Sequence, residues 1–175
     1  MTGKILVLVI LAASIGIGGA IYYLQVYAYY RVIPTAEVPP VALVLRADGL
    51  SDVIDVRNAQ AIDSDSSPLR FRSCFSAVDA PQQLPDTYVQ YGNPTPLIAP
   101  AWFDCFDARE IGAALEAGQA QAYLSEANFI YGFDRVVAIL PDGRGFVWPQ
   151  LNNCGEEVFD GAAAPEGCPP APERN

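Results

Sequence analysis

Histidine is absent from the sequence, and the chain has a single lysine, Lys4, and a single methionine, Met1. Without histidine, sites that depend on an imidazole are excluded: a Ser-His-Asp or Cys-His catalytic centre, a His-ligated zinc ion and ordinary haem ligation. A histidine kinase is excluded as well, because the phosphoacceptor is missing. Acid–base catalysis by paired carboxylates stays open, but twenty acidic residues offer such pairs by chance. We therefore expect a protein that is not an enzyme and that carries no cofactor and no metal.

Positive charge is scarce beyond Arg31. Residues 32–175 contain eight Arg against all twenty acidic residues, which gives a net charge of −12. This charge opposes binding to nucleic acid and to anionic lipid headgroups, because both are negatively charged. We expect no nucleic-acid partner. The acidity is typical of a soluble exported domain, and recruitment of a basic partner is the alternative.

Charge of either sign is missing from residues 5–30, a run of 26 residues in which the polar residues, tyrosines aside, are Ser14 and Gln25. About 20 apolar residues cross the roughly 30 Å hydrocarbon core of a bilayer, and a single segment satisfies its own backbone there only as a helix. We expect a transmembrane helix over 5–30, after a cytoplasmic stub at 1–4. The run exceeds the roughly 7–15 apolar residues of a signal peptide, although Gly18-Gly19-Ala20 leaves cleavage open as the alternative.

The charges on either side of this run indicate its orientation. Lys4 and the amino terminus precede the run and Arg31 follows it, which is a weak positive-inside bias. We therefore expect a protein of the bacterial inner membrane, with a cytoplasmic N-terminus and a periplasmic C-terminal domain. The acidic domain and its cysteines agree with export to an oxidising compartment.

Two patterns in the run indicate contact with another membrane protein. Ala12, Gly16 and Ala20 recur every four residues, and such a stripe of small side chains lets a second helix approach closely. The far end of the run holds five of the nine tyrosines: Tyr22, Tyr23, Tyr27, Tyr29 and Tyr30. Tyrosine suits the headgroup layer, so this cluster is either an interfacial belt or a docking surface for a membrane partner.

The four cysteines are widely spaced and form no C-x-x-C pair: they are Cys74, Cys105, Cys154 and Cys168. An even number at such spacing in an exported domain predicts two disulfides, with a cysteine-only metal site as the alternative. Of three possible connectivities we expect Cys154 with Cys168, because this bridge closes a loop of about 15 residues and contributes roughly 3 kcal/mol. Cys74 then pairs with Cys105, and a Pro- and Gly-rich tail at 161–175 is tethered by the other bridge.

The residues between the run and the tail predict an α+β fold. We expect a small, mostly antiparallel β domain over residues 41–160 with one short helix, joined to the transmembrane helix by a Pro-containing stalk at 31–40. Residues 61–68 and 81–100 are expected to be loops. Alternating and β-branched patterns predict strands at 41–46, 51–57, 69–76, 121–127, 133–140 and 145–148.

Local signals place the helix and the turns of this domain. Asp107 followed by Glu110 predicts a helix start, and Gly118 predicts its end. Asp142-Gly143 predicts a hairpin turn, and Asp48-Gly49 predicts a second turn. The aromatic residues before the helix are expected in the core: Trp102, Phe103 and Phe106.

Four arginines are candidates for binding a small anion: Arg70, Arg72, Arg135 and Arg144. Alternation over 69–76 puts Arg70 and Arg72 on one face of the predicted strand, where they could clamp a carboxylate or phosphate. The alternative is pairing with the acidic residues of the same domain.

Several segments together resemble an uncharacterised bacterial family of unknown function, whose members have a single N-terminal span and a small cysteine-bearing domain. The resemblance rests on YLQVYAYY at 23–30, SPLRFRSCF at 67–75, WFDCFDAREIGAALEAG at 102–118 and DRVVAILPDGRGFVW at 134–148. It implies the same architecture here, and it implies no activity and no site residue.

Two functions from different classes are consistent with these features. The first is a membrane-anchored, non-catalytic accessory, scaffold or assembly protein, whose acidic periplasmic domain binds an envelope or membrane protein. The second is an extracytoplasmic sensor or a domain that binds a small anionic ligand. The dense tyrosines, the small-residue stripe and the missing catalytic groups favour the first.

Overall fold

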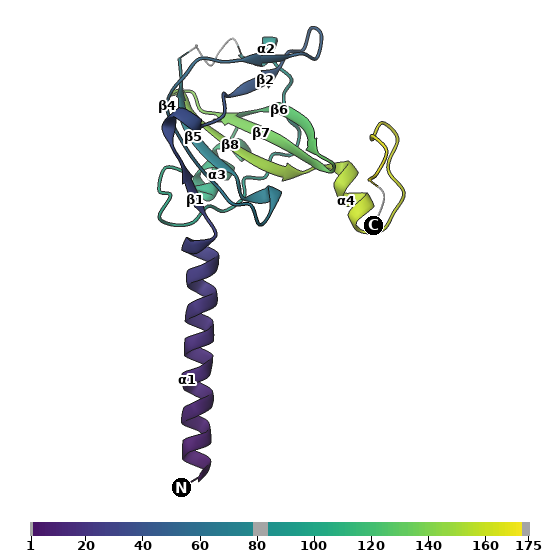
Figure 1. Cartoon of the computed structure of the whole chain (residues 1–175). Helices are drawn as coiled ribbons and strands as arrows, with labels where there is room; N and C mark the ends of the chain where they lie inside the picture. The colour runs from purple at the N-terminus through teal and green to yellow at the C-terminus, as the bar shows by residue number, and fades with distance from the viewer. Residues whose placement is uncertain (1, 79–83, 173–175) are drawn as a thin grey trace.

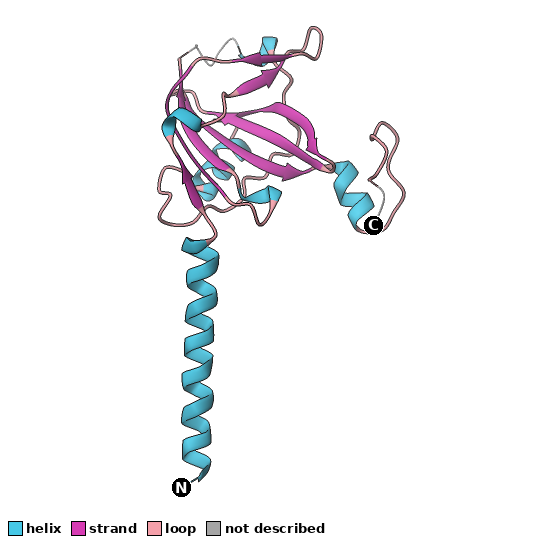
Figure 2. Cartoon of the chain, in the orientation of Figure 1, coloured by secondary structure: helices cyan, strands magenta, loops and turns pink. Residues whose placement is uncertain are grey.

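The computed structural model describes residues 2–78 and 84–172. Helix α1 (Thr2–Tyr23) continues into a short π-helix (Leu24–Ala28), and together they extend away from a β-sheet domain (Figures 1 and 2). The segment Gly3–Ala28 is long and apolar enough to cross a membrane. Its side chains stand free of the domain along most of its length, as expected for a helix whose surroundings are lipid.

An antiparallel sheet of six strands forms the body of the domain, in the order β1-β4-β5-β8-β7-β6. Its strands are β1 (Arg31–Ile33), β4 (Val56–Asp63), β5 (Arg72–Ala77), β6 (Gln121–Ile130), β7 (Phe133–Ile139) and β8 (Arg144–Leu151). Strands β2 (Ala42–Val44) and β3 (Ser51–Val53) make a separate antiparallel pair. The short helices are α2 (Leu84–Thr87), α3 (Ala108–Glu116) and α4 (Asn153–Phe159), with 3₁₀ turns at Thr35–Glu37 and Pro68–Arg70. An apolar helix followed by an antiparallel sheet with short helices confirms the predicted fold class.

Both faces of the sheet are covered. Alternation along β7 and β8 sends Val136 and Trp148 to one face and Val137 and Val147 to the other. The first face packs against α3 and the aromatic loop before it; the second packs against β2 and α2. The core therefore has two apolar layers, and Trp148 is fully buried in the first.

The two predicted disulfides are present with the predicted pairing. Cys74 on β5 bonds to Cys105 in the loop before α3, with 6.2 Å between their Cα atoms. Cys154 on α4 bonds to Cys168 in the tail, with 5.7 Å between their Cα atoms. Each of the four sulfurs belongs to one of these two disulfides, so none is left to ligate a metal, and the alternative of a cysteine-only metal site is ruled out.

The predicted helix and hairpin are confirmed in detail. Asp107 caps α3 by accepting from the backbone N–H groups of Arg109 and Glu110 at 2.8 and 3.2 Å. Between β7 and β8, Gly143 has a φ of +86°, which a residue without a side chain adopts at no steric cost. Asp142 accepts from the backbone N–H of Arg144 at 3.0 Å and closes the turn.

The predicted stalk is wrong at its start. Residues 31–33 form the edge strand β1, in register with 61–63 of β4, so the sheet begins at Arg31 and not at residue 41. Only Tyr29 and Tyr30 separate the end of the π-helix from β1. Val32 and Ile33 are β-branched and precede the first proline, Pro34, so nothing in this short segment prevents strand pairing.

Strand β4 falls across two predicted elements. Its first residues were expected in the strand at 51–57, and its last residues in the loop at 61–68. A β-bulge explains the error: Asn58 has a φ of +54°, and the pairing with β5 shifts between Arg57 and Gln60. The extra residue breaks the alternation on which the prediction depended.

The strand predicted at 69–76 begins at Arg72. Residues Pro68–Arg70 form a 3₁₀ turn, in which Ser67 accepts from the backbone N–H of Leu69 at 3.3 Å. Serine at the cap and proline at the first helical position are a helix-start signal that prevails over the alternating pattern. Arg70 and Arg72 therefore lie on different elements.

Candidate functional site

The end of the apolar helix is bonded directly to side chains of the domain. Arg70 donates from Nη2 to Gln25 Oε1 at 2.8 Å and from Nη1 to the backbone oxygen of Gln25 at 3.5 Å. Trp102 donates from Nε1 to the backbone oxygen of Val26 at 2.7 Å. The last carbonyls of a helix lack partners within it, and here two loops of the domain supply donors. We call Gln25, Val26, Tyr30, Arg70 and Trp102 the junction.

Aromatic contacts complete the junction. The Tyr30 ring packs edge-on against Trp102, with 6.2 Å between the ring centroids. The guanidinium of Arg70 lies 5.3 Å from the Tyr30 ring centroid, at cation–π distance. A positive group at the C-terminal end of a helix also complements the helix dipole. These contacts set the direction of α1 relative to the sheet.

Arg72 fixes the two loops that supply Arg70 and Trp102. It is only 3% exposed. Its guanidinium donates to the backbone oxygens of Leu69 and Phe71 at 2.7 Å each, on the Arg70 side. It also donates to Leu97 at 2.9 Å and to Ile98 at 3.2 Å, on the Trp102 side. One buried side chain thus holds both halves of the junction in register.

Arg72 is a buried cation, and it has no carboxylate partner among residues 2–78 and 84–172. Burial lowers its pKa from 12.5 to about 10, because the interior disfavours the charged form. The group nevertheless stays protonated at neutral pH. Four carbonyl dipoles and the Phe106 ring, whose centroid is 5.8 Å from the guanidinium carbon, replace the lost water.

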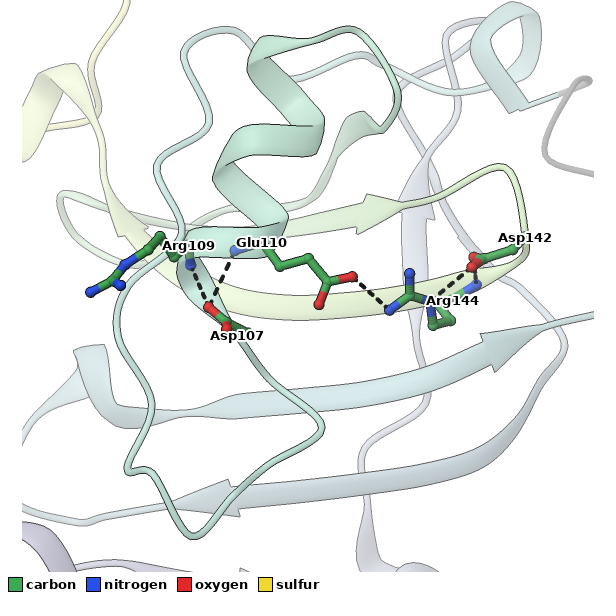
Figure 3. A network of polar contacts seen from close by, with 5 residues as sticks. All are labelled: Asp107, Arg109, Glu110, Asp142 and Arg144. Atoms are coloured by element: carbon green, nitrogen blue, oxygen red, sulfur yellow. Dashed lines mark hydrogen bonds and ion pairs between the residues drawn. The ribbon is translucent and has the colours of Figure 1, made fainter.

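Arg144 belongs to a separate network of polar contacts, which Figure 3 shows. It donates to Asp142 at 2.8 Å and to Glu110 at 2.9 Å, so the start of α3 is linked to the β7–β8 hairpin. Arg144 lowers the pKa of Asp142 through these hydrogen bonds, and the two carboxylates raise the pKa of Arg144. All three side chains are about half exposed.

Arg135 lines a hollow of about 530 Å³ beside the β1 edge. It pairs with Glu126 at 3.1 Å and lies against the rings of Phe71 and Phe129. Arg31 lines the same hollow, together with three acidic residues: Glu37, Asp63 and Asp65. The hollow therefore does not carry a positive balance.

The four candidate arginines each have separate partners. Arg135 and Arg144 pair with acidic residues of the domain, as the alternative in the sequence analysis held. Arg70 bonds to Gln25, and Arg72 bonds to backbone carbonyls, and these partners match neither of the two predicted alternatives. Binding of a small anion stays a prediction.

The candidate residues of the apolar run lie on α1, on the π-helix and just after it, and they differ in exposure. Ala12, Gly16 and Ala20 are exposed, and a methyl group built on Gly16 would meet no atom within 4 Å. Tyr22 and Tyr23 both contact the ring of Tyr27 on the outside of the helix, with centroids 6.4 and 5.9 Å apart. Tyr30 is half-buried in the junction and differs from the others. Packing of the outer residues against a partner stays a prediction.

Asp134 on β7 is a second buried charge, and it was not among the residues predicted from the sequence. It accepts from the Tyr91 hydroxyl at 3.1 Å, from the backbone N–H of Asn128 at 2.8 Å and from the Asn152 amide at 2.6 Å. These residues border a hollow of about 550 Å³ beside α4. Burial, followed by the nearby Asp134 carboxylate, raises the pKa of Tyr91, so its hydroxyl stays a donor.

Sequence signals for these features existed in part. Asn152 caps α4 by accepting from the backbone N–H of Gly155 at 3.0 Å, and an asparagine followed by Glu156 is a helix-start pattern. Arg72 has no comparable signal in the sequence. Nothing in the alternating segment at 69–76 or in the uncharged loop at 95–103 indicates that this arginine donates to the carbonyls of Leu97 and Ile98.

The fold and the junction define a small antiparallel β-sheet domain fixed to the end of one apolar helix. The chain belongs to a family of unknown function (DUF6446), whose sequence profile matches residues 41–169. The match covers the domain from β2 to the tail, and it leaves out α1, the π-helix and β1. No curated protein and no solved structure matches the chain.

Proposed function

We propose that this protein is a non-catalytic accessory, scaffold or assembly factor of the bacterial inner membrane, which presents its acidic domain to a membrane or envelope protein. The junction is the observation that supports this proposal. A domain that only binds or converts a soluble molecule needs no fixed orientation relative to its membrane anchor. Here the helix end is bonded to Arg70 and Trp102, and two residues separate it from the sheet.

A rigid connection has a consequence for partner binding. With no spacer, the domain stays at one height above the bilayer and faces one direction relative to α1. A partner in the same membrane can then contact α1 and the domain together, and the second contact gains from the high effective concentration that a short connection provides. The free face at Ala12, Gly16 and Ala20 and the outer tyrosines offer such a contact within the membrane.

The disulfides and the flanking charges support a periplasmic domain. Disulfides persist in oxidising compartments such as the periplasm, and Lys4 with the amino terminus, against Arg31 on the far side, gives a weak positive-inside bias toward a cytoplasmic N-terminus. An alkaline phosphatase fused after Asn175 should therefore be active, whereas a fusion before Thr2 should not. The opposite result would overturn the orientation.

The function is tested by isolating the full chain from membranes in mild detergent. We expect a stoichiometric membrane protein to co-purify. A flexible Gly-Ser linker of about six residues between Tyr30 and Arg31, combined with Arg70→Met and Trp102→Phe to remove the hydrogen bonds of the junction, keeps the anchor and the domain but releases their relative orientation. Capture of the partner should fall sharply with this linker. A matched insertion in the turn at Asp48-Gly49, away from the junction, should leave capture unchanged.

Two results would contradict the proposal. A protein that purifies alone from crosslinked membranes has no stable partner to assemble. A small anionic molecule that co-purifies in place of a protein would favour the sensor function.

A further inference from the structure

The loop at 95–103 exposes an isolated apolar side chain next to the junction. Its sequence, TPLIAPAWF, has no charged residue. Ile98 is 83% exposed, more than any large hydrophobic residue of α1, where Ile15 reaches 74%. A single exposed apolar side chain needs no explanation by itself. Ile98 is informative because it lies in an uncharged loop that is bonded to the end of the apolar helix.

The position of this loop indicates what that surrounding is. Trp102, four residues after Ile98, is bonded to the backbone oxygen of Val26. At 1.5 Å per residue, about 20 residues from Ile5 span the hydrocarbon core, so Val26 lies within about 3 Å of its boundary. The hydrogen bond thus fixes Trp102 at headgroup depth, where tryptophan is enriched in membrane proteins.

Several backbone polar groups of the loop are already paired within the protein or are missing, which lowers the cost of moving the loop out of water. Arg72 occupies the carbonyls of Leu97 and Ile98 from the protein side. Pro96 and Pro100 have no N–H group, and the Pro100 carbonyl accepts from the N–H of Phe103 at 2.9 Å. Transfer of a loop into a lipid interface is costly mainly through unpaired backbone groups, and here several of them are already paired or missing.

We infer that the loop at 95–103 rests in the interfacial layer of the membrane that α1 crosses, with Ile98 inserted among the lipid headgroups and the upper acyl chains. The inference rests on the proposed membrane anchor. The contact is apolar, because the loop has no basic residue to attract anionic headgroups. It gives the domain a second point of attachment, so that the domain can neither tilt nor rotate about the helix end.

The experiment uses the full chain in phosphatidylcholine vesicles, with an environment-sensitive fluorophore on a single introduced cysteine. The test position is Ile98→Cys. The matched control is Leu50→Cys, which is also apolar, is 64% exposed and directly precedes β3. Strand β3 pairs with β2, which lies on the side of the domain away from α1 (Figure 1). Ile15→Cys reports on the span itself. Quenching by brominated acyl chains and by aqueous iodide is measured at each position.

Brominated chains should quench the label at 98 several-fold more than the label at 50, and iodide should show the reverse order. Replacing part of the phosphatidylcholine by phosphatidylglycerol should leave this result unchanged.

Each contrary outcome has a separate meaning. If the label at 15 is quenched by brominated chains and the label at 98 behaves like that at 50, the loop does not touch lipid and the inference is wrong, whereas the anchor stands. Shielding at 98 from both quenchers would overturn it in favour of contact with a second copy of the chain. A requirement for phosphatidylglycerol would overturn the apolar contact. If the label at 15 is not quenched, the anchor proposed above fails as well.

Discussion

Arg72 and Asp134 are both buried charges beside irregular backbone, yet they hold it in opposite ways. Arg72 donates to four backbone carbonyls and gathers the segments that form the junction. Asp134 accepts from one backbone N–H and two side chains and holds the turn beside α4. Carbonyl-rich loops need a cation with many donors; a turn with a left-handed residue such as Asn128, whose φ is +48°, needs an acceptor.

The two regions also differ in how deeply they connect to the core. The Cys74–Cys105 bridge near Arg72 joins β5 to the loop before α3, and Cys74 is part of the main apolar cluster. The Cys154–Cys168 bridge near Asp134 closes an outer loop of the tail. A substitution at Arg72 should therefore destabilise the sheet and the junction. The effect of a substitution at Asp134 should be confined to the residues near α4.

The largest effect is expected for Arg72→Met. This change removes the donors from four backbone carbonyls and empties a buried site, so we expect a loss of about 3–5 kcal/mol in the free energy of unfolding. Urea denaturation followed by Trp fluorescence measures it. Arg72→Lys should be intermediate, because an ammonium has three donors and cannot reproduce the planar fork. Arg109→Met, at an exposed site on α3, is the control and should change stability by no more than about 0.5 kcal/mol.

A loss below 1 kcal/mol for Arg72→Met would mean that water replaces the guanidinium. The junction would then not depend on Arg72, and the contrast between the two regions would disappear.

A smaller effect is expected for Asp134→Ala. Three donors lose their acceptor, but the adjoining hollow of about 550 Å³ can admit water, so we expect a loss of about 1–3 kcal/mol. Asp134→Asn is the matched control and should cost less, since its amide oxygen can still accept from the Asn128 N–H. Hydrogen exchange should show faster exchange in α4 and in the turn at 128–132, with β5 unchanged. Exchange that accelerates equally in β5 would contradict the separation of the two regions.

The sequence predicted those parts of the molecule that depend on near neighbours in the chain. The Asp107 cap, the Asp142-Gly143 turn and the uncharged run each carry their signal within a few residues. The disulfide pairing followed from one short loop, which left only one partner for Cys74. The role of Arg72 could not be predicted from near neighbours in the chain, because its acceptors at Leu97 and Ile98 are 25 and 26 residues distant. The bulge at Asn58 hid β4, and the pairing of β1 with β4 depends on a contact about 30 residues away in the sequence.

The smallest effect concerns the exposed pair of Arg144 with Asp142, which is the counterpart of the two buried charges. The pKa of Asp142 is lowered from 3.8 by its hydrogen bonds to Arg144, so the folded state binds its proton less readily than the unfolded state. The pair therefore contributes stability above about pH 4, and the contribution is lost as the pH falls through the lowered pKa. Because Asp142 is about half exposed, solvent screens the pair, and we expect only about 0.2–1 kcal/mol.

The measurement is the difference in unfolding free energy between the wild type and Asp142→Asn. It should be present at about pH 6, decrease as the pH falls below about 4 and shrink in 1 M salt. A difference that changes neither with pH nor with salt would show that the amide disturbs the hairpin turn itself, through the hydrogen bond from the Arg144 backbone N–H, and that the charge contributes nothing.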